Sequence, residues 1–303
     1  MKRIGKILLR TVLALFILLN IVTAFHAYKF THFYDAGESI QQNKLQSILF
    51  GINAAKKQND AQDSIAEKVI LTTSGQVKLD GWYSPVDSAK GTVCLFHGHG
   101  GTKSGVNKEA AAFRAMGYNT LQLDFRAHGN SGGHTCTIGY YEAEDVKLAY
   151  DFIKNKGEQN IVLWGISMGA ATITKAINDY ELKPSKIILE MPFGSILDAA
   201  KGRIRLMGLP AQPLATLITF WGGAEHGFWA FNMKPAEFVK KINCPVLLQW
   251  GLQDPRVSRK EIDDIYGNIS SQKKLVVYDN TGHQSICKIE YDKWMAEVSG
   301  FLK

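Results

Sequence analysis

The sequence is short of several features that mark whole classes of protein. Its four cysteines form no C-x-x-C pair, which argues against a zinc ribbon or a thioredoxin-type redox site. Outside the N-terminus it has no run of lysine or arginine, so we expect no nucleic-acid-binding stripe and interpret the net charge of +7 as a solvated basic surface. Short-period repeats and low-complexity tracts are also missing, which argues against a repeat architecture.

What is present fits a globular protein with a sizeable core. The 303 residues are enough for one large catalytic domain with additions, or for two small domains. Hydrophobic residues make up 46% and charged residues 21% of the chain, and both values are ordinary for a globular protein.

Residues 1–27 carry the one long hydrophobic run. Four basic residues, Lys2, Arg3, Lys6 and Arg10, precede an apolar stretch over 11–25. That stretch spans about 22 Å as a helix, and residues 7–9 bring it closer to the roughly 30 Å of a bilayer core. The basic flank should stay in the cytoplasm, which places the rest of the chain in the periplasm or on the outer face.

Three interpretations of this segment remain open. A retained signal anchor is favoured, because the residues before Ala27 form a poor cleavage pattern. A cleaved signal peptide would instead give a secreted protein, and a buried core helix is the third alternative. Residues 28–65 then predict an amphipathic linker helix, with apolar positions at Ile40, Leu45, Ile48, Leu49 and Ile52. We expect it to pack on the domain, with the membrane surface as the alternative.

From residue 66 to residue 303 the pattern alternates between strands and helices. A hairpin is predicted over 68–83, and further strands are predicted over 91–97, 118–124, 160–166, 185–192, 245–251 and 273–279. Helices are predicted over 107–117, 141–157, 168–179, 258–268 and 287–303. Such alternation predicts an α/β fold with a mostly parallel sheet and helices on both faces.

One segment, residues 192–241, breaks the alternation. It separates two strands by far more chain than an ordinary crossover needs. It is rich in aromatic residues, namely Phe220, Trp221, Phe228, Trp229 and Phe231. We interpret it as a lid inserted over the site; a helical decoration without substrate contact is the alternative.

The pattern G-x-S-x-G occurs twice, around Ser131 and around Ser167. A nucleophile elbow needs a buried strand before the serine and a helix directly after it. Ser167 has both, "NIVLW" before and "MGAATITKAI" after, whereas "GGHTCTIG" after Ser131 cannot start a helix. We therefore predict that Ser167 is the nucleophile.

A serine nucleophile needs a base and an orienting carboxylate. His283 follows the strand over 273–279 and is the candidate base. Asp254 follows the strand over 245–251 and is the candidate acid, with Asp279 as the fallback. For the oxyanion we expect two backbone donors, the N–H of Met168 and the N–H of His99 or Gly100.

With these residues in order, the chain resembles the α/β-hydrolases, and among them membrane-anchored hydrolases related to serine aminopeptidases and dienelactone hydrolases. The resemblance covers residues 66–303 and rests on "LFHGHGG", "LDFRAHGNSGG", "GISMG", "GLQDPRV" and "GH". It implies an α/β-hydrolase fold with eight strands, the triad of Ser167, Asp254 and His283, and no cofactor. Similar proteins usually have R-G-H-G where this chain has Ala127 in place of the first glycine, and Arg126 and His128 are then structural loop residues.

The implied reaction is acyl transfer to water through an acyl-serine, with an ester or thioester favoured. A small or lipid-derived acyl substrate fits the anchor and the aromatic lid; a peptide or amide substrate and a non-catalytic binding module are the alternatives.

His97 and His99 alone do not make a metal site, because no third ligand is near them in sequence. In this fold Cys136 and Cys287 would both lie in loops near the active-site edge. An extracytoplasmic location would permit a disulfide between them, and whether they pair stays open. The oligomeric state stays open.

Overall fold

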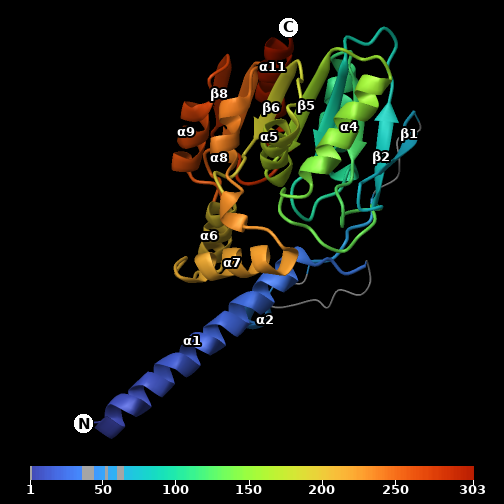
Figure 1. Ribbon diagram of the computed structural model, residues 1–303. Helices are drawn as coiled ribbons and strands as arrows, with labels where there is room; N and C mark the ends of the chain where they lie inside the picture. The colour runs from blue at the N-terminus through green and yellow to red at the C-terminus, as the bar shows by residue number, and fades with distance from the viewer. Residues whose placement is uncertain (1, 36–43, 52–53, 60–64) are drawn as a thin grey trace.

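The computed structural model describes residues 2–35, 44–51, 54–59 and 65–303, and its centre is one eight-stranded sheet (Figure 1). The strand order is β1-β2-β4-β3-β5-β6-β7-β8. Only the pairs β1–β2 and β2–β4 are antiparallel; every other neighbouring pair is parallel. This confirms the predicted mostly parallel sheet. The strands are β1 (Glu67–Thr72), β2 (Lys78–Ser84), β3 (Thr92–Phe96), β4 (Asn119–Leu123), β5 (Ile161–Ile166), β6 (Lys186–Glu190), β7 (Val246–Gly251) and β8 (Lys273–Tyr278).

Helices cover both faces of the sheet. On one face α3 (Asn107–Ala115), α10 (Ile286–Ile289) and α11 (Tyr291–Leu302) contact one another, and the rings of Phe113 and Trp294 lie 5.5 Å apart. The other group in mutual contact is α4 (Ala143–Asn155), α5 (Met168–Tyr180), α8 (Pro235–Phe238) and α9 (Arg259–Asn268). The central strands β3, β5 and β7 are almost wholly buried between these layers, as expected for continuous apolar runs. The helix predicted over 287–303 is divided at Glu290 into α10 and α11.

The segment between β6 and β7 forms a cap at the carboxyl ends of the strands. It contains α6 (Ile196–Leu206), α7 (Leu214–His226) and α8, with short 3₁₀ turns at Ala230–Asn232 and Val239–Lys241. In Figure 1 helices α6 and α7 lie outside the sheet and beside the end of α1. The segment over 192–241 is thus largely helical; its role as a lid stays a prediction.

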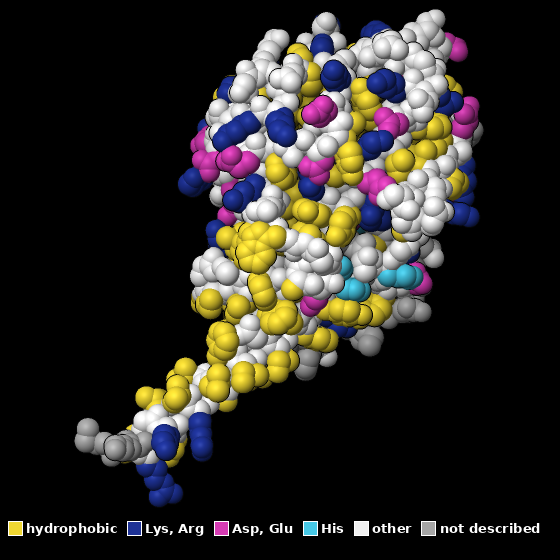
Figure 2. Space-filling model, viewed as in Figure 1, with side chains coloured by type: hydrophobic (Ala, Val, Ile, Leu, Met, Phe, Trp, Pro, Cys, Tyr) yellow, Lys and Arg dark blue, Asp and Glu magenta, His cyan; other side chains and the backbone are white. Residues whose placement is uncertain are grey.

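Helix α1 (Lys2–Thr31) projects from the domain as one continuous helix. It is long and apolar enough to cross a membrane, and 6% of its most apolar window is buried. Figure 2 shows hydrophobic side chains along its length and lysine and arginine at its free end. Such exposure argues against a core helix, because a core helix buries its apolar side chains.

The last turns of α1 pack on the cap, beyond the predicted boundary at residue 27. Ala27 and Thr31 are buried, and the indole N–H of Trp221 on α7 donates to Asn20 Oδ1 at 3.2 Å. The predicted linker helix over 28–65 is therefore wrong in its extent. Its described part holds the end of α1 and the seven-residue α2 (Lys44–Phe50), while Tyr34 and Ala55 pair in an isolated bridge. Ile40 and Ile52 lie outside the described residues.

The disulfide between Cys136 and Cys287 that the sequence left open is not formed. Both are buried free thiols, and the Cys136 thiol donates to Met168 Sδ at 3.6 Å. Cys287 lies in α10 rather than in a loop. Burial raises the pKa of both thiols, which makes them poorly reactive packing residues.

Candidate active site

Ser167 occupies a sharp turn between β5 and α5. Its backbone is in a strained conformation, with φ 53° and ψ −113°, and its N–H donates to Glu190 O at 2.8 Å. The two flanking glycines are required by close contacts: a Cβ on Gly165 would lie 2.6 Å from the carbonyl carbon of Gly169, and one on Gly169 would lie 2.2 Å from Phe96 O. The strand-turn-helix context predicted for Ser167 is present.

The structure brings the other two predicted residues to this serine. Ser167 Oγ lies 2.8 Å from His283 Nε2, and His283 Nδ1 lies 2.7 Å from Asp254 Oδ2. The second oxygen of Asp254 accepts from the backbone N–H groups of Arg256 at 2.7 Å and Val257 at 3.0 Å. These two bonds hold the carboxylate in place beside the imidazole. Asp279, the fallback acid, is 71% exposed and lies 3.7 Å from Lys293 instead.

Ser131 is held away from any such chemistry. It is buried, its hydroxyl donates to Asp124 O at 2.7 Å, and it accepts from the Asp80 N–H at 2.9 Å. Both hydrogen-bonding directions of this hydroxyl are used to join its loop to strand β2 and to the end of strand β4. The second G-x-S-x-G match is therefore a structural serine.

The backbone donors expected for an oxyanion differ in availability. The Gly100 N–H donates to His128 Nε2 at 3.0 Å, so it is engaged. The His99 N–H has no acceptor among the described residues. The Met168 N–H is at the first position of α5, where a helix leaves its donors without intrahelical acceptors. Of the three predicted donors, His99 and Met168 are free to receive an oxyanion.

His128 and Arg126 support the loop that reaches Gly100, as predicted. His128 Nδ1 lies 2.8 Å from Arg126 O, so this nitrogen carries the proton and Nε2 accepts. Burial, with His97 nearby, lowers the His128 pKa to about 3. Arg126 pairs with Asp145 at 2.6 Å and Glu144 at 3.0 Å. Ala127 adopts φ 63°, the left-handed conformation that the usual glycine would favour.

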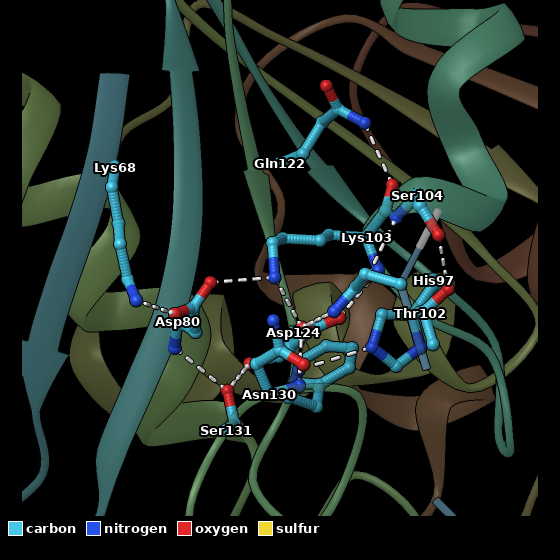
Figure 3. A network of polar contacts seen from close by, with 12 residues as sticks. Lys68, Asp80, His97, Thr102, Lys103, Ser104, Gln122, Asp124, Asn130 and Ser131 are labelled. Atoms are coloured by element: carbon cyan, nitrogen blue, oxygen red, sulfur yellow. Dashed lines mark hydrogen bonds and ion pairs between the residues drawn. The ribbon is translucent and has the colours of Figure 1, made fainter. Parts of the chain in front are cut away.

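Sequence reasoning missed a buried ion cluster beneath this loop (Figure 3). Lys103 is 0% exposed, and its ammonium lies 2.7 Å from both Asp80 Oδ1 and Asp124 Oδ2. The Lys103 N–H also donates to Asp124 Oδ1 at 2.6 Å. The lysine stands in a polar, glycine-rich loop, and nothing in the local sequence distinguishes it from an exposed residue. His97 lies beside the cluster, where its Nε2 accepts from the Phe125 N–H at 3.2 Å.

Two adjoining hollows lie at this end of the sheet. The polar pocket contains Ser167 and His283 together with His99, Arg203 and Arg256. The apolar cavity lies between α1, α6 and α7 and is lined by residues that include Ala27, Ala200, Ile204, Met207, Ile218 and Gly222. Phe30, Ile138, Ala199 and Arg203 line both, so the two hollows share a wall.

The cap aromatics are distributed unevenly around these hollows. Among the five aromatic residues singled out from the sequence, only Phe228 lines the apolar cavity. Trp221 faces Asn20 of α1, while Phe220 and Trp229 are exposed. The lining instead comes from small and aliphatic residues and from the end of α1, which no sequence pattern indicated.

The chain is similar to several known proteins. A family model described as serine aminopeptidase, S33, matches residues 87–221. The uncharacterized protein YqkD of Bacillus subtilis is 26% identical over 209 residues, which cover 68% of each chain. Lysophosphatidylserine lipase ABHD12 of Xenopus tropicalis is 30% identical over 200 residues, 61% of this chain and 49% of that protein. The chain thus matches about half the length of these lipases.

Among solved structures, the esterase Pf2001 of Pyrococcus furiosus shares the fold. It superposes with a TM-score of 0.68 at 22% sequence identity and covers 82% of this chain and 96% of its own. The sheet order, the strained serine turn, the family model and these relatives lead to one assignment. The chain belongs to the α/β-hydrolase superfamily of enzymes.

Proposed function

We propose that this protein is a serine hydrolase that cleaves a carboxylic ester of a lipid-derived acid through an acyl-enzyme on Ser167. The observation that carries the proposal is the continuous hydrogen-bonded series from Ser167 through His283 to Asp254. Asp254 Oδ2 accepts a hydrogen bond from the N–H at His283 Nδ1, which leaves Nε2 as an acceptor facing the serine hydroxyl. This is the arrangement that a general base requires.

The chemistry then follows in two balanced steps. Ser167 Oγ attacks the carbonyl carbon while its proton moves to His283 Nε2, and the resulting oxyanion accepts from the N–H groups of His99 and Met168. The bond from the carbonyl carbon to the alkoxy oxygen breaks, and His283 returns the proton to the departing alcohol. Water repeats the sequence on the acyl-serine, which releases the acid and restores the hydroxyl.

The apolar cavity supports an acyl chain as one half of the substrate. It adjoins the polar pocket at Phe30, Ile138 and Ala199, so a chain esterified at Ser167 has an apolar path away from the nucleophile. Relatives named lysophosphatidylserine lipase agree with a lipid-type ester. The cap over 192–241 acts in this proposal as the lid.

Blocking the cavity should shift the chain-length preference. In Ala200→Phe an aromatic ring would fill part of the lining. We expect the ratio of kcat/KM for a dodecanoyl ester to that for a butanoyl ester to fall about tenfold, since lost burial of one or two methylenes costs about 0.8 kcal/mol each. Steady-state hydrolysis by the full chain in detergent micelles measures this ratio.

Leu206→Phe is the matched control for that experiment. Leu206 lies on the same helix but is 43% exposed and outside the cavity lining, so the ratio should not change. An unchanged ratio in Ala200→Phe would contradict the acyl-chain assignment. A panel that adds a thioester and an aminoacyl arylamide tests the leaving group; faster arylamide cleavage would favour the peptidase alternative.

We also propose that α1 is a retained membrane anchor and that the domain lies outside the cytoplasm. Cleavage after Ala27 would remove a wall of the apolar cavity and the Asn20 partner of Trp221. Lys2, Arg3, Lys6 and Arg10 lie at the free end and favour its cytoplasmic placement. Protease added to sealed right-side-out vesicles should digest an epitope placed after Lys303. An epitope placed before α1 should still be part of the mature chain, and it should be protected from the protease. A protected C-terminal epitope would reverse the topology, and a missing N-terminal epitope would indicate cleavage.

A further inference from the structure

The polar pocket carries more positive than negative charge. Four cationic side chains line it, Lys57, Arg203, Arg256 and Lys288, against the single carboxyl group of Glu109. Glu109 accepts a hydrogen bond from Ser285, and burial raises its pKa, so its negative charge is weakened. Burial also lowers the pKa of His97 and His99, which stay neutral at pH 7. A pocket with this balance attracts an anion.

Arg203 is fixed in position yet lacks a counter-charge. Its guanidinium carbon lies 4.3 Å from the centre of the Phe30 ring. Its Nη2 lies 3.4 Å from His99 Nδ1, and His99 Nε2 lies 3.2 Å from Phe30 O, so His99 donates to the carbonyl and accepts from the arginine. Within the described ranges no carboxylate forms an ion pair with Arg203. Burial and the charge of Arg256 lower its pKa to about 10.

Arg256 stands next to Arg203 because α6 packs directly on its backbone. A Cβ on Gly202 would lie 2.4 Å from Arg256 O, so only glycine permits this approach. The Arg256 N–H is bonded to Asp254 Oδ1, which ties the residue to the loop of the acid. Its guanidinium likewise pairs with no carboxylate in the described part of the chain. A bound anion would offset the repulsion between these two like charges.

We propose that Arg203 and Arg256 bind an oxyanion group, phosphate or carboxylate, carried by the ester substrate. This rests on the proposed function and defines the substrate as an amphiphile, with its acyl chain in the apolar cavity and its anion in the polar pocket. Arginine suits such a role because its planar donors match two oxygens of a phosphate or carboxylate. The same charges disfavour the free α-ammonium group of an aminopeptidase substrate.

The test compares esters that share the dodecanoyl chain and differ in the group at the glycerol 3-position, and it follows the release of dodecanoate. The full chain in neutral detergent is assayed with 1-dodecanoylglycerol, with its 3-phosphate, and with its 3-hemisuccinate, which separates phosphate from carboxylate recognition. The measured quantity is kcat/KM for each anionic ester divided by that for the neutral ester. In Arg203→Met and in Arg256→Met we expect this ratio to fall at least about tenfold, mainly through KM.

Arg205→Met is the matched control, because Arg205 lies on the same helix but is exposed and outside both hollows. Its ratio should stay at the wild-type value, and Arg203→Lys should recover part of the preference. Equal losses for neutral and anionic esters would overturn the inference and leave the arginines a structural role. If the wild type hydrolyses none of the three esters, the proposed function fails instead.

Discussion

Replacing Ser167 with alanine should lower kcat for an ester substrate by about 10⁴- to 10⁶-fold. The acyl-enzyme route disappears with the hydroxyl, and only binding and the backbone donors of His99 and Met168 remain. A fluorophosphonate probe, which reacts with activated serines, should label the wild type and leave Ser167→Ala unlabelled. Gel fluorescence measures the labelling. The full chain in detergent is used, because α1 forms part of the apolar cavity and should not be removed.

Two further variants make this result specific. Ser131→Ala removes the serine of the second motif and should keep the labelling, since its hydroxyl only joins Asp124 to Asp80. Asp254→Asn should reduce kcat about 10⁴-fold, because an amide favours the wrong tautomer of His283. A wild type that folds but takes no label would sink the hydrolase mechanism and favour the binding-module alternative. Labelling that survives in Ser167→Ala would assign the reactive serine elsewhere.

The sequence was most informative at positions where both the backbone conformation and the chemistry restrict the residue type. The turn at Ser167 needs a buried strand, small neighbours and a following helix, and each leaves a local signature. Asp254 and His283 follow β7 and β8, neighbouring parallel strands whose carboxyl ends meet at one edge of the sheet. Local patterns therefore predicted the residues that the fold brings together.

Features that depend on distant contacts could not be predicted in this way. The apolar cavity combines α1 with α6 and α7, which are separated from α1 by more than half of the chain. Periodicity in residues 28–65 suggested one long helix, yet the end of α1 and a pairing at Tyr34 take up this segment. The sequence also could not show which backbone N–H groups are available as donors. The Gly100 N–H is engaged because His128 Nε2 accepts from it. Such outcomes follow from tertiary packing, which overrides local propensity.

The largest effect on stability is expected from Lys103→Met, which should lower the free energy of unfolding by about 3–5 kcal/mol. The change removes the ammonium that lies between Asp80 and Asp124 and leaves two buried carboxylates with less compensation. The Lys103 ammonium lies 4.6 Å from the centre of the Trp82 ring. Methionine has a side chain of similar length, so the apolar part of the contact with this ring is kept. Urea denaturation followed by tryptophan fluorescence should show a lower midpoint at an unchanged slope.

Two further variants test whether the lost charge of Lys103 causes the loss of stability. Adding Asp80→Asn to Lys103→Met should recover part of the loss, because one of the two buried carboxylates becomes neutral; Lys68, 3.1 Å from Asp80, compensates the charge of Asp80 only from the exposed side. Lys147→Met removes an exposed pair with Asp151 and should cost about 0.5 kcal/mol or less. A loss in Lys103→Met no larger than in Lys147→Met would contradict the cluster as a stabilising element. Since residues 97–103 carry both His99 and the lysine, the cluster links the stability of the fold to the geometry of the proposed oxyanion donor His99.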